Sequence, residues 1–567
     1  MQLRLHAGRY PLGGRPLNIS VDGIELVADS SEETTISGGL RLEWSNTDDR
    51  SSSLWTSPVP ASGSPRQLWV GGRRAVPARH PNTGYLRWES ALPGPFARWG
   101  LIYEADAQLK QWAGDEVVGA HVVLFWSWTA SRHCVVAHDA ASRTLIFDRP
   151  SRQPLGDHLT QSGRRFFLEG FAAALDASGE FAADATRDGE PTIMYMPTEA
   201  DLQVNAMVES YVATAGLTTL LHAEAVGGGL DQKLNGSGQP LSAPRPLHRL
   251  RVVGLTFEHA DWSLPPAPRM ADWQAAAFLT DAAIVLRHVH GATFSRVSIR
   301  HVGGYALWLD QGATNCRLDE SEMSDLGAGG VRIGTMELPH DSTSDSQRDE
   351  RVSNEAAPSW ATAEDGHETD GHAVERPLAV ASHNELVASR IVDGGHVFRE
   401  GVGVLIHRSQ HNAIEENEIA HLGYTGVSLG WEWGYAERSG GGHNRVVRNF
   451  IHHIGRWELA DMGGVYVLGR AHGTLIEGNV IAHVASYHTC APPPTEPRDR
   501  HMYTCVGMCW PLPDCRPFPL GSISRVCRRV GHLPRRGRLP CDRAPECRAP
   551  YALRRLASAF WLQQHNR

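Results

Sequence analysis

Three stretches of this 567-residue chain repeat one phrase: HNAIEENEIAH (411–421), HNRVVRNFIHH (443–453) and GTLIEGNVIAH (473–483). A weaker copy precedes them, and one isoleucine of each copy recurs at spacings of 28, 32 and 30 residues: Ile391, Ile419, Ile451 and Ile481. Such a period is typical of a solenoid, and short β-branched runs broken by Asn and Gly favour coils of strands over helices. The sequence therefore predicts an all-β, right-handed parallel β-helix. The isoleucines should form one buried column, and the recurring asparagines a hydrogen-bonded ladder at the turn.

The repeat extends toward the N-terminus. Four positions from Phe294 to Gly303 match four positions from Leu318 to Gly327 at a uniform spacing of 24 residues, which predicts two more consecutive coils. Between these coils and the quoted repeats, residues 335–381 are polar and acidic. We expect a long loop there, because solenoids tolerate insertions at their corners.

Changes in composition divide the remaining chain. Residues 1–82 contain short alternating strands and are predicted to form the first coils. Residues 83–185 contain aromatic strands without the 24-to-32-residue period, which predicts an inserted antiparallel, β-sandwich-like module. The main solenoid is then expected over 186–486, continuous from about residue 190.

The C-terminal stretch 487–567 differs from all of this. Residues 488–567 hold 14 Arg, five acidic residues and seven of the nine Cys, without an apolar period. Such a stretch cannot bury enough apolar surface to offset its chain entropy, so we expect disorder. A frame shift or retained intron in a GC-rich coding region gives this composition. A basic, disulfide-rich appendage is the alternative.

Bulk properties exclude several classes of partner. The formal net charge of −9 argues against nucleic acid. No apolar run reaches the 18 residues that a membrane-spanning helix needs, and the N-terminus has no signal-peptide pattern. We expect a monomer that binds a polysaccharide or oligosaccharide, without a cofactor or metal.

Several motifs resemble the family 141 glycoside hydrolases over roughly residues 1–486. They are SGG (37–39), RQLW (66–69), GVGV (401–404), GYTGVSLGWEWGY (423–435) and DMGGVYVLG (461–469). The resemblance implies a right-handed parallel β-helix enzyme that cleaves plant cell-wall glycans, with α-L-fucosidase and xylanase activities in the family. It also implies a secreted protein, so the N-terminus of this chain is expected to be incomplete.

Asp461 is the first candidate catalytic residue. Glycoside hydrolysis commonly uses two carboxyl groups that flank the scissile bond, and the glycines after Asp461 leave space for a sugar. By resemblance, Asp461 matches a carboxylate proposed as catalytic in the family. The alternative is an Asp that caps a turn before a Gly pair.

Further candidates surround Asp461 in the sequence. Trp431, Trp433 and Tyr435 alternate as on a strand, so they can share one face and stack on sugar rings, or equally form an aromatic core ladder. Glu400 and Tyr466 are predicted to line the substrate cleft, although a solvated turn explains Glu400 as well. His453 lies one turn before Asp461. It also repeats His421 and His483, which makes it a turn residue first; a column of histidines does not give a tetrahedral zinc site.

The family's next coil, which carries a Gly-Gly-Trp-Gly-x-Tyr-x-Asp-Glu-Gly-Ser segment, is missing after Tyr487. Two outcomes therefore stay open for the glycosidase prediction: an active enzyme, or a chain that lost its second carboxylate and is inactive. A polysaccharide lyase is a second hypothesis, weakened because the predicted solenoid strands contain no Lys. A carbohydrate-binding β-helix without catalysis is the third.

Overall fold

The computed structural model describes residues 1–29, 32–46, 54–112, 114–156, 164–184, 192–204, 206–224, 245–335, 380–431 and 441–487. The predicted loop over 335–381 and the predicted tail from 487 fall mostly on residues 336–379 and 488–567, which lie outside these ranges. Trp433 and Tyr435 lie in 432–440 and are also outside them.

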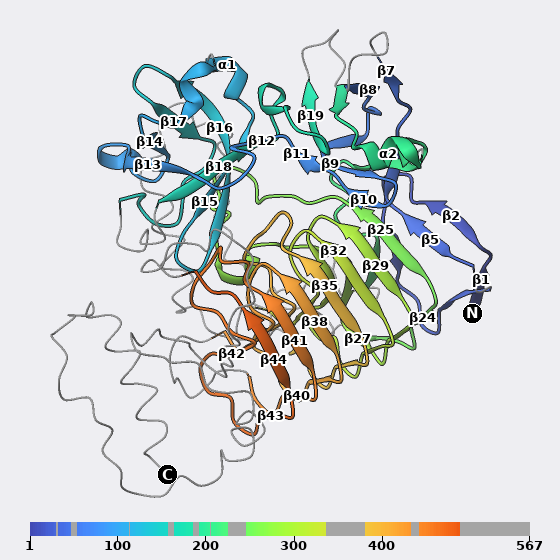
Figure 1. Ribbon diagram of the computed structural model, residues 1–567. Coiled ribbons are helices and arrows are strands. Elements are labelled where there is room, and N and C mark those ends of the chain that lie inside the picture. Colours follow the sequence, from blue (N-terminus) through green and yellow to red (C-terminus); the bar gives the residue numbers. More distant parts are fainter. Residues whose placement is uncertain are drawn as a thin grey trace, which may run out of the picture. The chain divides into compact units, whose positions relative to one another are not determined.

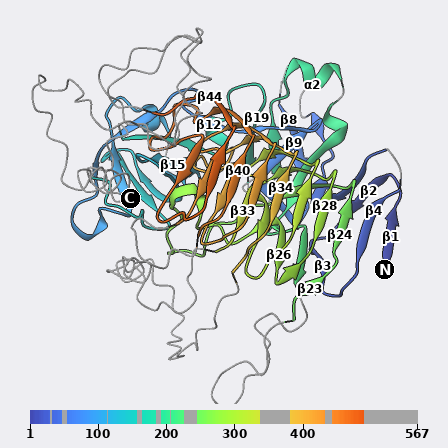
Figure 2. The ribbon, with the colours of Figure 1, turned by 90° about the horizontal axis from the view of Figure 1, so that it is seen from below.

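Three long parallel sheets form a right-handed parallel β-helix, as the sequence predicts (Figures 1 and 2). Each coil contributes one strand to each sheet in the order A, B, C, except that the last described coil has strands only in sheets A and B. Sheet A consists of β1 (Gln2–Leu5), β4 (Glu25–Ala28), β24 (Arg251–Val253), β28 (Thr293–Ser295), β31 (Arg317–Asp319), β34 (Glu385–Val387), β37 (Ala413–Glu415), β40 (Arg445–Val447) and β43 (Leu475–Glu477). Sheet B consists of β2 (Gly8–Pro11), β5 (Thr34–Ser37), β25 (Thr256–Ala260), β29 (Ser298–Val302), β32 (Glu322–Leu326), β35 (Arg390–Gly394), β38 (Glu418–Leu422), β41 (Phe450–Ile454) and β44 (Val480–Val484). Sheet C consists of β3 (Leu17–Ile19), β22 (Leu221–Glu224), β26 (Ala282–Arg287), β30 (Tyr305–Leu309), β33 (Val331–Ile333), β36 (Val404–Ile406), β39 (Val427–Leu429) and β42 (Val465–Val467). A short pair, β23 (Leu247–His248) and β27 (Val289–His290), runs beside them.

The predicted isoleucine column is confirmed. The register of sheet B pairs one inward-facing position from coil to coil: Phe257, Ile299, Met323, Ile391, Ile419, Ile451 and Ile481. All seven side chains are buried in the main hydrophobic cluster. Outward-facing residues alternate with them, as the pleat of a strand requires.

The asparagine ladder is confirmed as well. At the turn between sheets A and B, the Asn417 Nδ2 donates to Asn449 Oδ1 at 3.0 Å, and the Asn449 Nδ2 donates to Asn479 Oδ1 at 2.9 Å. A second ladder joins Asn384, Asn412 and Asn444 before sheet A. These buried amides bond backbone groups that the turns leave without partners, which explains their recurrence by structure alone.

The prediction that all of residues 1–82 form coils is wrong beyond β5. The following strands leave the solenoid for two smaller sheets. One is antiparallel and contains β10 (Arg73–Arg74), β9 (Gly63–Val70), β21 (Ser210–Thr214) and β6 (Gly39–Arg41). The other contains β11 (Val76–Pro77), β19 (Glu180–Asp184), β20 (Thr192–Tyr195), β8 (Trp55–Pro58) and β7 (Ser45–Asn46).

The solenoid resumes at β22, so it is not continuous from about residue 190 as predicted. The physical reason is that antiparallel hairpins and solenoid coils share one local pattern of short strands broken by Gly. Strand pairing, which depends on distant residues, distinguishes the two.

The inserted module is antiparallel, but it forms a closed barrel and not a sandwich. Its sheet contains β12 (Arg79–His80), β18 (Arg165–Glu169), β13 (Leu86–Ala91), β14 (Gly100–Tyr103), β17 (Thr144–Phe147), β16 (Ala130–Asp139) and β15 (His121–Phe125). Pairing of β15 with β18 closes it. The short helices of the described residues are η1 (Gly94–Phe96), η2 (Gln108–Gln111), α1 (Gly114–Val117), η4 (Ala172–Ala174), α2 (Glu199–Gln203), η5 (Ala206–Glu209) and η6 (Gln274–Ala276). No helix among the described residues has the length and apolar character needed to cross a membrane.

The barrel contacts the loops that lead from sheet B to sheet C, here called the B–C loops. The Arg132 Nη2 donates to the Val397 carbonyl at 2.9 Å, and the Ala460 N–H donates to the Ser127 carbonyl at 2.6 Å. The Arg149 Nη1 donates to the Pro265 carbonyl at 2.7 Å. Three B–C loops from different coils therefore pack against one barrel.

Candidate active site

The candidate site consists of residues in the B–C loops and at the start of the sheet C strands that follow these loops. These loops cover residues 261–281, 395–403, 423–426 and 455–464. Because consecutive coils stack in register, residues far apart in sequence become neighbours here. Asp461 and Glu400, which the sequence singled out, lie on two of these loops.

Asp461 is a half-buried carboxyl group held by aromatic hydroxyls. The Tyr466 hydroxyl donates to both carboxylate oxygens, at 3.3 and 3.2 Å, and the Tyr424 hydroxyl donates to the Asp461 carbonyl at 2.7 Å. Burial raises the pKa of Asp461, while the hydrogen bond from Tyr466 acts in the opposite direction. Asp461 has a φ of 54°, a left-handed conformation that Asp tolerates better than most residues. The carboxyl group is therefore fixed in orientation and biased toward retaining a proton.

Gln274 extends this network. Its Nε2 donates to the Tyr424 hydroxyl at 3.1 Å, whereas its Oε1 has no hydrogen-bond partner among the described residues. Gln274 belongs to η6, in the long B–C loop over 261–281. The tyrosine that holds the backbone of Asp461 is thus itself held by a more distant coil.

Glu400 is a fully buried carboxyl group near this network. Its side chain is 1% exposed, and neither carboxyl oxygen has a hydrogen-bond partner among the described residues. Burial, reinforced by the negative charge of Asp272, raises the pKa of Glu400 to about 8 against weaker opposing effects of backbone groups and Arg132. The burial of Glu400 rules out the solvated turn, which was the alternative to a cleft residue, and its raised pKa keeps most of this carboxyl group protonated at neutral pH.

Asp272 was not predicted from the sequence. It is buried, and burial raises its pKa to about 7 although the Arg152 backbone N–H donates to its Oδ2 at 2.7 Å. The Oδ1 has no partner among the described residues. Asp272 lies in a B–C loop outside the repeat, and its neighbour Arg152 belongs to the barrel module. The only local signal was an irregular loop rich in Pro and Trp.

Trp431 is buried and therefore does not form an exposed platform for a sugar ring. It is 5% exposed; its ring centroid lies 6.4 Å from that of Trp273 and 4.9 Å from that of His407, the latter at 90°. Tyr466, predicted to line the cleft, is also buried, with its hydroxyl on Asp461. The structure brings Asp461 and Tyr466 together, with Glu400 close enough to act on Tyr424 electrostatically.

His453 lies elsewhere. It is exposed at the end of β41 and stacks between His421 and His483, with ring centroids 5.0 and 4.3 Å away. These contacts agree with the interpretation of the three histidines as one repeat position. Within the part of the chain that the structure describes, the hydrogen-bond partners of Asp461 are Tyr424 and Tyr466 and do not include His453.

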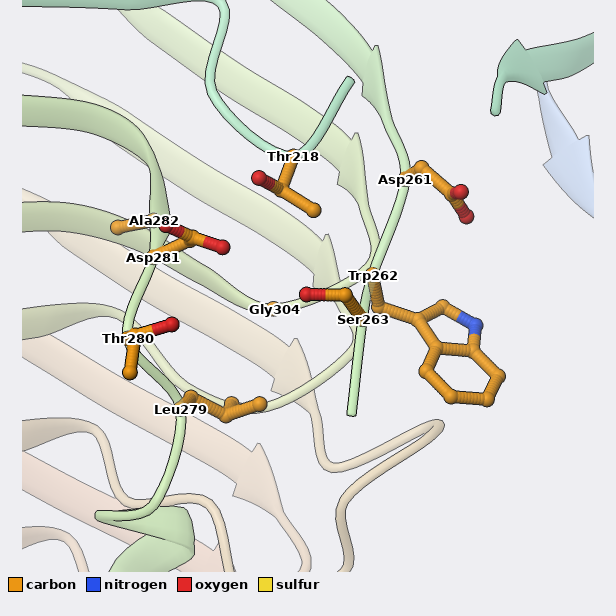
Figure 3. Close-up of a pocket in the computed structure, with 9 residues that line it drawn as sticks. All are labelled: Thr218, Asp261, Trp262, Ser263, Leu279, Thr280, Asp281, Ala282 and Gly304. Atoms are coloured by element: carbon orange, nitrogen blue, oxygen red, sulfur yellow. The ribbon is translucent and has the colours of Figure 1, made fainter. Parts of the chain in front are cut away.

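A separate shallow pocket beside the B–C loops contains none of the candidate catalytic residues. It is lined by Thr218, Asp261 to Ser263, Leu279 to Ala282 and Gly304 (Figure 3). Its most buried carboxylate, Asp261, points away from the centre and accepts from Arg66 at 2.7 Å and from the Gly216 N–H at 2.9 Å. Asp261 therefore serves as a structural anion that joins loops.

No protein-family model matches the chain, and a search of curated proteins finds no match. Among solved structures, one described as "Glycoside hydrolase" matches with a TM-score of 0.63 and 20% identity, covering 84% of this chain and 80% of that one. A second, "The complex structure of XylC with xylose", matches with a TM-score of 0.40 and 10% identity, covering 85% of this chain and 62% of that one. The first comparison establishes a shared fold.

Proposed function

We propose that this chain is a glycoside hydrolase that cleaves a plant cell-wall or related polysaccharide, such as xylan or a fucosylated glycan, with Asp461 as a catalytic carboxyl group. One observation carries the proposal. Asp461 and the buried Glu400 lie on the two B–C loops that flank the loop of Tyr424, in the solenoid that resembles family 141, and the Tyr424 hydroxyl donates to the Asp461 carbonyl. The fold shared with a solved structure described as a glycoside hydrolase supports it.

The residues suit a two-carboxyl mechanism. One group gives a proton to the leaving oxygen, and the other attacks the anomeric carbon or removes a proton from water. A carboxyl group that keeps its proton at neutral pH is suited to the first role, as Glu400 and Asp272 are. Both are covered in this structure, so direct transfer to a sugar requires the B–C loops and the barrel to separate locally. Asp461 reaches solvent without such a movement.

This arrangement bears on the second carboxylate. The segment that supplies it in the resembling family is missing after residue 487. Glu400 or Asp272 takes that place in our proposal, and the chain is then active despite its divergent C-terminal stretch.

The lyase hypothesis needs a free basic side chain beside the sugar. The arginines nearest to Glu400 are already engaged: Arg132 pairs with Glu169 and donates to the Val397 carbonyl, and Arg399 lies 3.5 Å from Glu458. We therefore favour hydrolysis over β-elimination.

The test is a panel of polysaccharides incubated with the full chain. It includes xylan, fucosylated xyloglucan and pectin, and reducing ends, unsaturated uronates and bound protein are measured in parallel. We expect new reducing ends without ultraviolet absorbance of unsaturated products. Absorbance that rises with the reducing ends would establish a lyase instead. Binding to a glycan without any bond cleavage would leave a carbohydrate-binding protein and overturn the proposal.

A further inference from the structure

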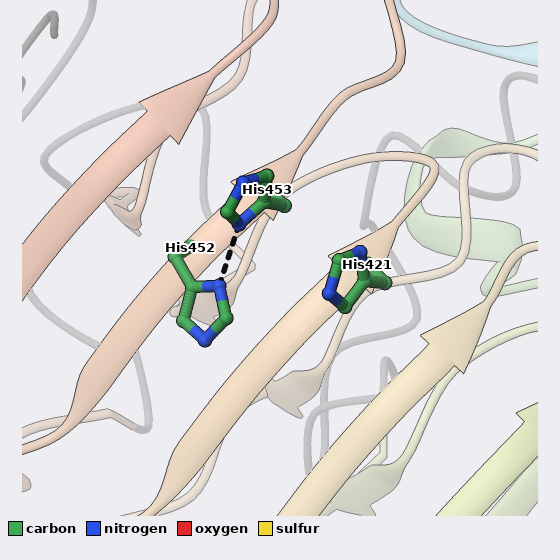
Figure 4. Close-up of side chains that lie close together, drawn as sticks. All are labelled: His421, His452 and His453. Atoms are coloured by element: carbon green, nitrogen blue, oxygen red, sulfur yellow. Dashed lines mark hydrogen bonds between the residues drawn. The ribbon is translucent and has the colours of Figure 1, made fainter.

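Three imidazole rings lie close together near the C-terminal ends of two neighbouring sheet B strands, just before the B–C loops over 423–426 and 455–464 begin. His421 is the next-to-last residue of β38, and His452 and His453 are consecutive in β41 (Figure 4). Each ring offers a nitrogen, and these nitrogens all lie within 4.8 Å of one another. His421 and His453 are exposed, so the cluster is open to solvent, whereas His452 is buried.

The backbone explains why two consecutive residues point to the same place. Side chains at successive strand positions normally face opposite sides of a sheet. His453 has a φ of 51°, which turns its side chain back toward His452 and brings their Nδ1 atoms to 2.7 Å. His421 has a matching φ of 57°, so its ring stacks on that of His453.

The neighbouring coils leave room for His452. In the register of sheet B, its partners on the two adjacent strands are Ala420 and Ala482. These small side chains let the His452 ring lie between the coils, where the ring of Phe450 stacks on it at 4.0 Å. The His452 ring therefore lies outside the column of stacked histidines. It can bind a metal ion from a direction that the stacked rings alone do not provide.

The surrounding charges favour a bound cation. The second nitrogen of His452, Nε2, lies 3.3 Å from Glu418 Oε1, and Arg390 holds the other oxygen of that carboxylate at 2.8 Å. A histidine that binds a metal ion through one ring nitrogen commonly donates from its other ring nitrogen to a carboxylate, which orients the ring. The guanidinium of Arg456 is directed to the His421 carbonyl and to Asp393.

A second group of possible metal ligands lies at the same edge of sheet B and consists of Asp325, Asp393 and His396. It is a weaker candidate for a metal site. Asp325 accepts hydrogen bonds from Arg74 at 2.6 Å, Trp69 at 2.8 Å and His301 at 2.7 Å. Its carboxylate is already neutralised and fully engaged, so it has no capacity left for an ion.

We propose that His421, His452 and His453 form a surface site for one divalent transition-metal ion of the kind that prefers imidazole, such as Zn²⁺, Ni²⁺ or Cu²⁺. Three nitrogen ligands leave at least one position open to solvent. The ion replaces the proton between the two Nδ1 atoms; two ligands of tetrahedral zinc lie roughly 3.4 Å apart, so the rings need to separate only slightly. This site is independent of the proposed hydrolysis.

The test uses the full chain without a polyhistidine tag and with those of its nine cysteines that are accessible in the folded protein alkylated. Ni²⁺ and Cu²⁺ are titrated by calorimetry, and the Cu²⁺ sample is examined by electron paramagnetic resonance. We expect the wild type to bind one equivalent more than His452→Gln, with nitrogen hyperfine structure in the spectrum. His421→Asn, which preserves the left-handed backbone, should weaken binding at least tenfold.

The matched control is His411→Asn, because His411 also has a positive φ and stacks between His383 and His443 at 4.7 and 4.8 Å. Among the described residues, the column of His383, His411 and His443 has no histidine beside it that corresponds to His452. It should therefore not contribute to metal binding. Equal stoichiometry and affinity in the wild type and His452→Gln would overturn the proposal. An equal loss in His411→Asn would overturn it too, since any stacked histidine would then suffice.

Discussion

Single residues of the candidate site are set by contacts that the sequence does not display. Asp461 could be selected from its DMGG context, and Tyr466 lies on the adjacent strand. A solvated turn explained Glu400 equally well, because its burial and the nearby charge of Asp272 depend on segments that are distant in sequence. Asp272 carried no local signal beyond an irregular loop rich in Pro and Trp. Burial and pKa depend on packing, so a sequence pattern predicts candidates but not their protonation states.

The raised pKa of Glu400 predicts how stability depends on pH. Between the ordinary pKa of a glutamate and about 8, the folded chain holds a proton that the unfolded chain has released. Unfolding therefore releases a proton in this range, and stability falls as the pH rises through it. Glu400→Gln should flatten this dependence and increase the free energy of unfolding at pH 8 by on the order of a few kcal/mol.

Denaturant unfolding of both proteins at pH 5 and pH 8 measures the effect. The exposed Glu43→Gln is the control and should follow the wild type. Asp272→Asn should reduce the pH dependence as well, since burial raises its pKa in the same direction. If Glu400→Gln loses as much stability between the two pH values as the wild type, Glu400 is ionised in the folded chain.

At the scale of elements, the sequence was most informative where a position repeats from coil to coil. The isoleucine column and both asparagine ladders follow from spacing alone, because every coil must place an apolar residue inside and satisfy the same turn. Strands β6 to β12 do not belong to the repeat, but their hairpins show the same local pattern of short strands as the coils, which led to the wrong prediction. The closure of the barrel by β15 and β18 depends on pairing across more than forty residues, which no local pattern encodes.

The asparagine ladder makes a quantitative prediction. Asn417 accepts from the Ser389 N–H at 2.9 Å and donates to the Leu386 carbonyl at 2.9 Å, both buried. Asn417→Ala leaves these groups without partners and should lower the free energy of unfolding by about 3 kcal/mol. Chemical denaturation measures it, and the exposed Asn18→Ala should change stability by less than about 0.5 kcal/mol. A loss for Asn417→Ala as small as that control would show that water replaces the ladder.

At the scale of the whole molecule, the site depends on two modules. The solenoid stacks the B–C loops in register, and the barrel covers them through Arg132, Arg149 and Ser127. Removal from water is what raises the pKa values of Glu400 and Asp272. Resemblance to family 141 pointed to the solenoid and to the module, but several of the contacts that join them are hydrogen bonds to backbone carbonyls, which leave no trace in residue type.

Hydrolysis by Asp461 is the central claim, and one comparison tests it most directly: the kcat/KM of the wild type against Asp461→Asn on a polysaccharide from the panel. The control is Asp393→Asn, which makes the same change at another left-handed Asp with a φ of 59°. We predict a loss of about a thousandfold for Asp461→Asn, as expected for a group that transfers a proton or attacks in the transition state. The control should retain wild-type activity. Unchanged turnover in Asp461→Asn, with the fold intact, would contradict the account.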